Sequence, residues 1–367
     1  MTDPRLENLA RILVDYSTAV RPGDWVWIRT HVLALPLANE VLRYVLRAGG
    51  RPTFNLESDE LKETYLREAG EDQLRWVSPD LPLAYEGADV LMNLRASSNT
   101  RALSGTDPAR QRLQAEALRP LGATYLRRAA EGQLRWVATQ FPCPAYAQEA
   151  DMSLGEYEDF VYAATFADQP DPVACWQKVH ADQQRLVDWL QGKREVVVRG
   201  PNADLRLSIA GRTFINSDGH TNMPSGEIFT GPVEDSAEGW IHFTYPAIHN
   251  AREVEGVELE FKAGKVAAAR AKKNEAYLLA LLDTDPGARF LGEFAFGANY
   301  GIRRFTKSIL YDEKIGGSIH MAVGAGYPQT GSRNESAIHW DFICDMRDDT
   351  EVLVDGEVFY KNGEFKI

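Results

Sequence analysis

Two histidines and an aspartate stand close together in the segment from Glu313 to Asp341. His339 and Asp341 flank Trp340 in a run with the composition of a strand, and His320 lies in a second such run. Residues two apart on a strand point to the same face, so we expect the imidazole of His339 beside the carboxylate of Asp341. Two adjacent strands that present His, His and Asp to one cavity would form part of a transition-metal site. The alternative is a hairpin whose histidine has a hydrogen-bond partner and whose aspartate caps a turn.

Two glutamates earlier in the chain lie in surroundings that favour a bound cation. Glu227 is bracketed by Pro and Gly before a strand-like run, and Glu293 lies in the apolar segment FLGEFAFGAN. A glutamate among Leu, Phe and Ala is costly to bury unless a partner compensates its charge, and a metal ion is such a partner. In the alternative, Glu293 faces solvent from the edge of a strand. Tyr327 adds a phenol in the loop between the two histidine-containing runs.

The candidate ligands together offer three carboxylates, two imidazoles and one phenol. One divalent ion rarely takes so many protein ligands, whereas two ions that share a bridging carboxylate use them naturally, at a separation of about 3.5–4 Å. Such a pair supports hydrolysis, because one ion polarises the scissile carbonyl and both lower the pKa of a bound water to about 7. The set is Glu227, Glu293, His320, Tyr327, His339 and Asp341.

Helical and strand patterns alternate through the first half of the chain. Strand-like runs near residues 22–30, 51–56, 88–95 and 134–142 are separated by helical stretches, the last of which spans 107–120. This alternation predicts βαβ units, and therefore an α/β domain over residues 1–192 with a doubly wound, mostly parallel sheet. This half contains neither a GxGxxG nor a GxxxxGK motif, so a nucleotide-binding site is not indicated.

The second half changes to short strands joined by turns. One example is the predicted hairpin within residues 351–367, which turns at Asp355-Gly356. We therefore expect residues 193–367 to form a mixed α+β domain rich in antiparallel strands. This domain carries all the candidate ligands and is the expected metal-binding catalytic domain. Length agrees with two domains, because 367 residues exceed the usual size of one core.

Composition and charge narrow the choice of partners. The net charge is -13 and there is no basic tract, which argues against nucleic acid and against an anionic membrane as partners. No apolar run approaches the length that spans a bilayer, and the first residues lack the pattern of a signal peptide. Cys143, Cys175 and Cys344 are widely spaced and odd in number, which fits reduced thiols in a cytoplasmic protein.

Four motifs in the second half resemble, in order, those of a known enzyme family. NMPSGEIFTGP, GEFAFGAN, DEKIGGSIHMAVGAGYPQTG and NESAIHWD are similar to the successive motifs of the thermophilic metalloaminopeptidases, the aminopeptidase T and aminopeptidase S family. RPGDWVWIR and FPCPAYAQEADMSLGEYEDFVY extend the resemblance over the first half. The resemblance implies two domains, a dinuclear site in the second domain, and a homodimer. The implied cofactors are two divalent ions per chain, zinc or cobalt, with magnesium or manganese as alternatives.

The resemblance also implies roles for the site residues. All six candidate ligands match the family motifs, with Glu293 as the bridge between two ions. Glu313 is then a general base that takes a proton from the bound water and returns it to the leaving amine, a residue that orients other site groups, or an exposed helix-end glutamate paired with Lys314. Glu293 is the base if it does not bridge. Tyr327 either ligates a metal or donates a hydrogen bond to the tetrahedral oxyanion.

These inferences predict a dinuclear metal-dependent aminopeptidase that hydrolyses the N-terminal peptide bond of peptides with a free N-terminus, through a metal-activated water. A second enzyme hypothesis is a metal-dependent amidase or deacetylase that acts on non-peptide amides. The non-enzyme hypothesis is a catalytically inactive, dimeric metal-binding protein. Its weakness is that every carboxylate, histidine and tyrosine of the motifs is present.

Overall fold

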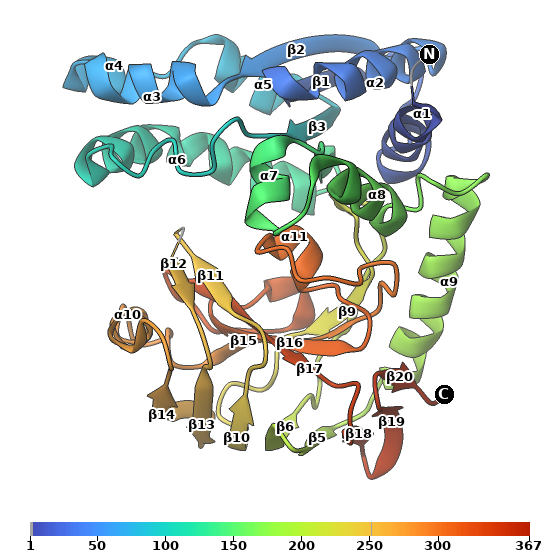
Figure 1. Ribbon diagram of the computed structural model, residues 1–367, viewed down its shortest axis with the longest axis vertical. Helices are drawn as coiled ribbons and strands as arrows, with labels where there is room; N and C mark the ends of the chain where they lie inside the picture. The colour runs from blue at the N-terminus through green and yellow to red at the C-terminus, as the bar shows by residue number, and fades with distance from the viewer. Residues whose placement is uncertain (1–2, 251) are drawn as a thin grey trace. The chain divides into compact units, whose positions relative to one another are not determined.

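The computed structural model describes residues 3–250 and 252–367, which fall into two compact units (Figure 1). The first comprises the residues up to Trp176 together with Gly219–Pro224, and the second comprises Gln177–Asp218 and Ser225–Ile367. The change from one unit to the other falls inside a single helix, α9 (Pro172–Leu190). The domain boundary between residues 192 and 193 stays a prediction.

The first unit is built around a five-stranded parallel sheet. Its strand order is β2 (Arg51–Glu57), β1 (Trp25–His31), β3 (Val90–Arg95), β4 (Arg135–Gln140) and β8 (Asn222–Met223). The helices are α1 (Pro4–Arg11), α2 (Leu35–Arg47), α3 (Asp59–Glu68), α4 (Glu71–Arg75), α5 (Asp80–Gly87), α6 (Pro108–Ala130), α7 (Pro144–Glu149) and α8 (Leu154–Ala164), with a π-helix at Ile12–Ser17 and a 3-10 helix at Val32–Ala34. The predicted α/β class with a doubly wound, mostly parallel sheet is confirmed.

Helices cover both faces of this sheet, which explains why the central strand β3 is an almost continuous buried apolar run, whereas the edge strand β2 is largely exposed. Trp27 of β1 packs with Ala84 of α5 on one face. On the opposite face, a Cβ at Gly50 would lie 2.9 Å from a methyl carbon of Val45 in α2 and 3.2 Å from one of Val26 in β1. A glycine between α2 and β1 therefore allows helix and sheet to approach closely.

The second unit consists mainly of antiparallel strands in two sheets. The eight-stranded sheet has the order β14 (Lys265–Arg270), β13 (Glu258–Lys262), β10 (Glu238–His242), β6 (Ala203–Ser208), β5 (Glu195–Gly200), β18 (Glu351–Val354), β19 (Glu357–Lys361) and β20 (Glu364–Phe365). The five-stranded sheet has the order β17 (His339–Asp345), β16 (Ser318–Gly324), β15 (Leu291–Gly297), β9 (Glu227–Thr230) and β7 (Ile215–Ser217). The remaining elements are the hairpin β11 (Ala247–His249) and β12 (Arg252–Val254), the helices α10 (Glu275–Leu282) and α11 (Ile309–Asp312), and a 3-10 helix at Pro328–Thr330.

Side chains from both sheets of the second unit form one continuous apolar core. Strands β6 and β13 alternate between buried and exposed residues, so the eight-stranded sheet keeps one face towards solvent. Strands β15 and β16 are buried along their whole length. The predicted α+β class is confirmed, and so is the hairpin at Asp355-Gly356, which joins β18 to β19. Among the described residues, no helix combines the length and the apolar composition needed to cross a bilayer.

Candidate metal centre

One face of the five-stranded sheet collects the acidic and histidine side chains. Strands β15, β16 and β17 pair so that Glu293 stands opposite Ala322, and Ala322 stands opposite Asp341. Paired residues of antiparallel strands point to the same face. His320 and His339 lie two residues from Ala322 and Asp341 in their own strands, so they share that face. The prediction that these strands bring histidine and carboxylate side chains together therefore agrees with the register.

Small residues make room on this face for the longer ligand side chains. Gly297 stands opposite Glu227, which brings the glutamate of β9 into the same row, and Ala295 stands opposite His320. A Cβ at Gly297 would lie only 2.2 Å from the carbonyl oxygen of Ile315, so no larger residue fits there. The intervening strand residues point the other way, into the apolar core: Ile228, Phe294, Phe296, Ile319, Met321, Trp340 and Phe342.

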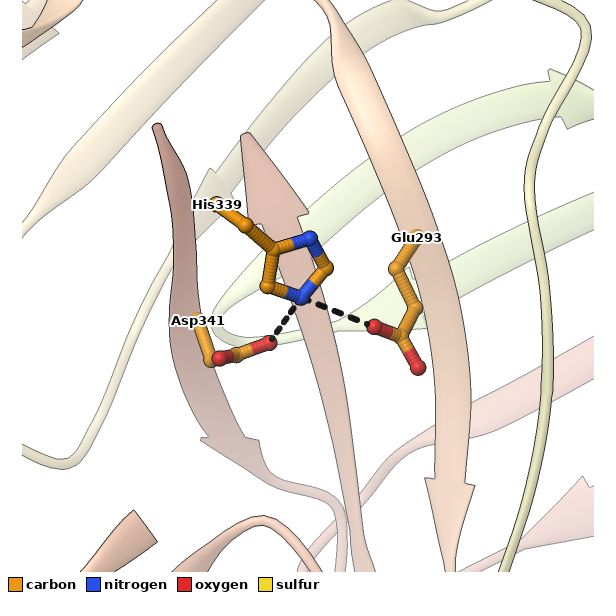
Figure 2. Close-up of side chains that lie close together, drawn as sticks. All are labelled: Glu293, His339 and Asp341. Atoms are coloured by element: carbon orange, nitrogen blue, oxygen red, sulfur yellow. Dashed lines mark ion pairs between the residues drawn. The ribbon is translucent and has the colours of Figure 1, made fainter. Parts of the chain in front are cut away.

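Glu293 lies between the two histidines. Its Oε2 atom is 3.2 Å from Nε2 of His339, which is itself 3.5 Å from Oδ1 of Asp341 (Figure 2). Its Oε1 atom is 3.7 Å from Nε2 of His320, which is 3.6 Å from Oε2 of Glu227. Each oxygen of Glu293 thus faces a different imidazole, and its side chain is 6 % exposed. The alternative of a solvent-facing Glu293 at a strand edge is wrong.

Two further contacts orient His339 and Tyr327. His339 donates from Nδ1 to the carbonyl oxygen of Ala325 at 2.7 Å, which directs Nε2 towards the carboxylates. The imidazole packs edge to face against Tyr327, with ring centroids 5.1 Å apart. Burial, together with the negative charges of Glu293 and Asp341, raises the pKa of Tyr327. The phenol therefore stays protonated in the metal-free protein.

Glu313 and Lys314 lie at the edge of the same cluster. Lys314 is fully buried; its ammonium group contacts the carboxylate of Glu313 and lies 3.5 Å from Oε1 of Glu227. A carboxylate oxygen of Glu313 lies within 4.8 Å of ligand atoms of His320 and Asp341. The side chain of Glu313 is 17 % exposed. The hypothesis of an exposed helix-end glutamate is therefore wrong.

The pKa values of the metal-free cluster show how strongly its charges interact. Burial alone would lower the pKa of His320, but interactions with Glu293, Glu227 and Glu313 together outweigh burial and raise it to about 9. The same balance, with Asp341 as the main partner, raises the pKa of His339 to about 11. Burial raises the pKa of Glu313 to about 8 in spite of the neighbouring ammonium group. Both imidazoles carry a proton at neutral pH that a metal ion would have to displace.

Acceptor atoms without partners show that the cluster fits divalent cations. Glu227 Oε2 and Asp341 Oδ1 are buried and have no hydrogen-bond partner among the described residues. Two triplets each bring three potential ligand atoms within 4.8 Å of one another: Glu293 with His339 and Asp341, and Glu313 with His320 and Asp341. Carboxylate oxygens and imidazole nitrogens are common ligands of zinc and of other transition metals. The donor set therefore suits the divalent ions expected from the sequence.

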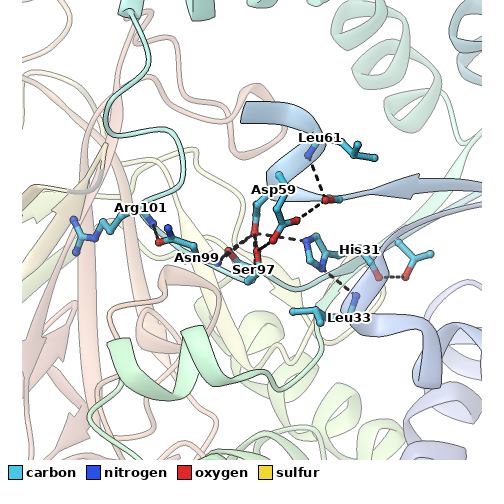
Figure 3. A network of polar contacts seen from close by, with 11 residues as sticks. His31, Leu33, Asp59, Leu61, Ser97, Asn99 and Arg101 are labelled. Carbon is cyan, nitrogen blue, oxygen red and sulfur yellow. Dashed lines mark hydrogen bonds and ion pairs between the residues drawn. The ribbon is translucent and has the colours of Figure 1, made fainter. Parts of the chain in front are cut away.

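A second polar cluster, in the first unit, contains the residue types of a catalytic triad but not its arrangement (Figure 3). The Ser97 hydroxyl and the Ser98 backbone N–H donate to the carboxylate of Asp59 at 2.8 and 2.7 Å. His31 accepts a hydrogen bond at Nδ1 from the Leu33 N–H, and its Nε2 lies 3.6 Å from Asp59. The serine donates to the aspartate rather than to the histidine, so His31 does not activate it as a nucleophile. This cluster fastens the loop after β3 to the start of α3.

Comparisons with known proteins place the chain in a family. A family model for the thermophilic metalloproteases (M29) matches residues 2–365. The chain belongs to the M29 family. This membership confirms the predicted resemblance and the predicted enzyme class, a metalloaminopeptidase hydrolase.

Several M29 relatives are aminopeptidases of similar length. Aminopeptidase T of Thermus thermophilus is 28% identical over 98% of this chain and 95% of its own length. Aminopeptidase T of Thermus aquaticus is 31% identical over 77% of this chain and 76% of its own, and aminopeptidase 2 of Geobacillus stearothermophilus is 26% identical over 94% and 93%. The solved structure of wild-type AmpT from Thermus thermophilus superposes with a TM-score of 0.86 over 99% of both chains, at 22% identity. That superposition shows that the two share a fold.

Sequence reasoning missed two residues that shape the M29 site. The sequence suggests Lys314 only as the partner of an exposed glutamate, because lysine is rarely buried and nothing local marks it as buried. Asn299 connects the segment before Glu227 to the segment that contains Lys314. Its Nδ2 donates to the carbonyl oxygen of Ser225 at 2.9 Å, and its backbone N–H donates to the carbonyl oxygen of Lys314 at 3.0 Å. A local signal for Asn299 was present, as it follows the apolar strand that contains Glu293.

Proposed function

We propose that this M29 protein is a dinuclear metal-dependent aminopeptidase that removes the first residue from peptides with a free N-terminus. The observation that carries the proposal is the convergence of buried and half-buried carboxylates and imidazoles on one sheet face: Glu227, Glu293, His320, His339 and Asp341. The aminopeptidases among its relatives support cleavage at the N-terminal bond.

Two divalent ions per chain would occupy neighbouring positions on this face. His339 and Asp341 would hold one ion, and His320 and Glu227 the other. The position of Glu293, with one oxygen towards each imidazole, supports its role as the bridge. When bound, the ions would supply Lewis acidity and a nucleophile near neutral pH. Zinc or cobalt is the proposed metal, with magnesium or manganese as alternatives.

Glu313 and Tyr327 would supply the remaining chemistry. The carboxylate of Glu313 lies at the edge of the ligand cluster, where it would take a proton from the attacking water and return it to the leaving amine. Tyr327, whose ring packs edge to face against the imidazole of His339, would donate a hydrogen bond to the tetrahedral oxyanion. Ligation by Tyr327 remains the alternative role.

The proposed preference for a free α-amine follows from the chemistry of this face. A free amine brings a basic nitrogen to a site rich in metal ligands, and this fixes the first peptide bond against the attacking water. An acetylated N-terminus has no basic lone pair and adds bulk at the same place.

Paired peptides test the proposal directly. The same sequence with a free and with an acetylated N-terminus should differ strongly in kcat/KM, and the free peptide should release single residues in order. Equal cleavage of both peptides, or first cuts inside the chain, would contradict an aminopeptidase. Acylated amines in the same panel test the amidase or deacetylase hypothesis, and the absence of any hydrolysis after reloading with zinc or cobalt would favour the inactive metal-binding protein.

A homodimer and a cytoplasmic location complete the proposal. The family resemblance implies the dimer, and the three widely spaced cysteines favour the cytoplasm. Light scattering on the purified protein would test the dimer.

A further inference from the structure

Lys314 places a positive charge where lysine is rarely found. Its side chain has no exposed surface, and its ammonium group lies between the carboxylates of Glu313 and Glu227. A buried ammonium group persists only where partners compensate the loss of water. The two partners belong to different elements, since Glu313 follows α11 and Glu227 begins β9. One side chain therefore joins the proposed general base to a proposed metal ligand.

The backbone around Lys314 is tied to the segment that enters β9. The Lys314 N–H donates to the carbonyl oxygen of Tyr311 at 3.0 Å, and the Lys314 carbonyl oxygen accepts from the Asn299 N–H at 3.0 Å. The Asn299 side chain donates to the carbonyl oxygen of Ser225 at 2.9 Å. The next residue, Gly226, has a φ of +111°, and a Cβ there would lie 2.7 Å from that of Asn299. These contacts fix the backbone of Lys314 relative to the start of β9.

Charge in the cluster is divided unevenly among its carboxylates. Glu227, Glu293 and Asp341 each lie within 4.0 Å of a histidine nitrogen. Glu313 has Lys314 as its ion-pair partner among the described residues, and no histidine reaches it at that distance. Without Lys314, no basic side chain among the described residues would lie within 4.0 Å of the Glu313 carboxylate.

We propose that Lys314 is a positioning residue of this site. Its ammonium group holds the carboxylate of Glu313 at the edge of the ligand cluster. This inference rests on the proposed function, in which Glu313 is the general base. Lys314 acts through Glu313 and does not touch substrate, because it has no exposed surface. Its removal should therefore lower kcat and leave KM unchanged.

Four variants test the kinetic part of this inference. Lys314→Met removes the charge and keeps most of the length, Glu313→Gln removes the base, and the double variant combines them. The control is Lys273→Met, because Lys273 also bridges two carboxylates, those of Glu253 and Glu255 at 2.6 and 2.5 Å, but on the surface of the same unit.

The two single site variants should lose kcat by a similar factor, and the double variant should be no slower than either. The control should keep the kcat of the wild type. Elemental analysis should find the same metal content in all of them, because Lys314 is not a ligand. Wild-type kcat in Lys314→Met, or losses that multiply in the double variant, would overturn the inference.

The metal-free protein gives a readout that does not depend on catalysis. After chelation, urea unfolding of the wild type, the two single variants and the double variant forms a thermodynamic cycle. Lys314→Met should destabilise the wild-type background more than the Glu313→Gln background, because the contact between Lys314 and the Glu313 carboxyl group exists only in the former. Additive effects would overturn the inference.

If Lys314→Met does not fold, a second variant at the same position is used for the same measurements. Lys314→Gln retains a hydrogen-bond donor and removes the charge, and the same outcomes apply to it. A wild type that shows the coupling in the metal-free state but releases no N-terminal residue from any peptide would instead overturn the proposed function, and with it the catalytic role of Lys314.

Discussion

Two carboxylate sites of this protein are satisfied in opposite ways. Asp59 in the first unit accepts hydrogen bonds from the hydroxyls of Ser97 and Ser98 and from the Ser98 backbone N–H, at 2.7–3.1 Å. Glu293 in the second unit has imidazole nitrogens at 3.2 and 3.7 Å as its ion-pair partners. Beside it, the Oδ1 atom of Asp341 is buried with no hydrogen-bond partner among the described residues.

The difference follows from the element to which each carboxylate belongs, a helix for Asp59 and a strand for Glu293. Asp59 begins a helix opposite a loop, where backbone N–H groups are free to donate. Glu293 lies within a strand whose backbone groups are used by the sheet ladder on both sides. Only side chains or bound ions remain to compensate a carboxylate at such a position. A carboxylate whose oxygens accept several hydrogen bonds connects parts of the structure. A carboxylate with an oxygen that accepts none can bind a cation.

Glu293→Gln should break the second site most severely. Loss of the charge between the two metal positions should cost at least one ion per chain and lower kcat/KM by more than about 10⁴-fold, above the range of a single general base. Elemental analysis after saturation and desalting should approach two ions for the wild type and fewer for the variant. Two retained ions would contradict a bridging role.

Glu313→Gln should separate catalysis from metal binding. The side chain keeps its size and loses its basic oxygen, so kcat should fall by about 10²–10⁴-fold. Both ions should remain, in contrast with Glu293→Gln. Full activity would assign Glu313 to the structure of the site rather than to proton transfer.

Asp59→Asn should weaken the first site without affecting the second. Hydrogen bonds to a charged acceptor contribute roughly 1.5–3 kcal/mol, so the free energy of unfolding should fall by about that amount at pH 7. Peptide hydrolysis at a temperature where the variant is folded should match the wild type, as should metal content. A variant with reduced metal content would show that the two sites are not independent.

The loss of unfolding free energy in Asp59→Asn should depend on pH only under acidic conditions. Burial alone would raise the pKa of Asp59, but its hydrogen bonds outweigh burial and lower the folded-state pKa below 3.8. The stabilisation is therefore fully present above about pH 4 and is lost as the pH falls through the folded-state pKa. The stability difference between wild type and Asp59→Asn, measured by urea unfolding, should be constant from pH 5 to 7 and shrink below pH 4. A difference that grows in acid would contradict the sign of this shift.

Sequence patterns were sufficient where one element decides the outcome. The alternation of His339, Trp340 and Asp341 predicts their faces, because a strand has a period of two. The burial of Lys314 beside the site carboxylates depends on contacts between separate elements. The local sequence therefore does not predict it. The helix expected to end near residue 120 continues as α6 to Ala130, with Pro120 inside it. Packing of later residues such as Leu121, which is 9% exposed, offsets the hydrogen bond that proline cannot make.

Strands β15, β16 and β17 carry the proposed ligands on one face and core residues on the other. This double use limits how the substrate preference of the enzyme can change. On the ligand face, the positions between the metal-binding side chains hold alanine or glycine, and a Cβ at Gly324 would lie 2.1 Å from the carbonyl oxygen of Ile338. On the other face, the same strands fill the apolar core. Few strand positions are left to tune which N-terminal residue is accepted, for example Ile343, which stands opposite His320, and Phe229, which stands opposite Ala295. New substrate preferences would arise mainly in the connecting segments, such as residues 325–338, while most of each strand stays fixed.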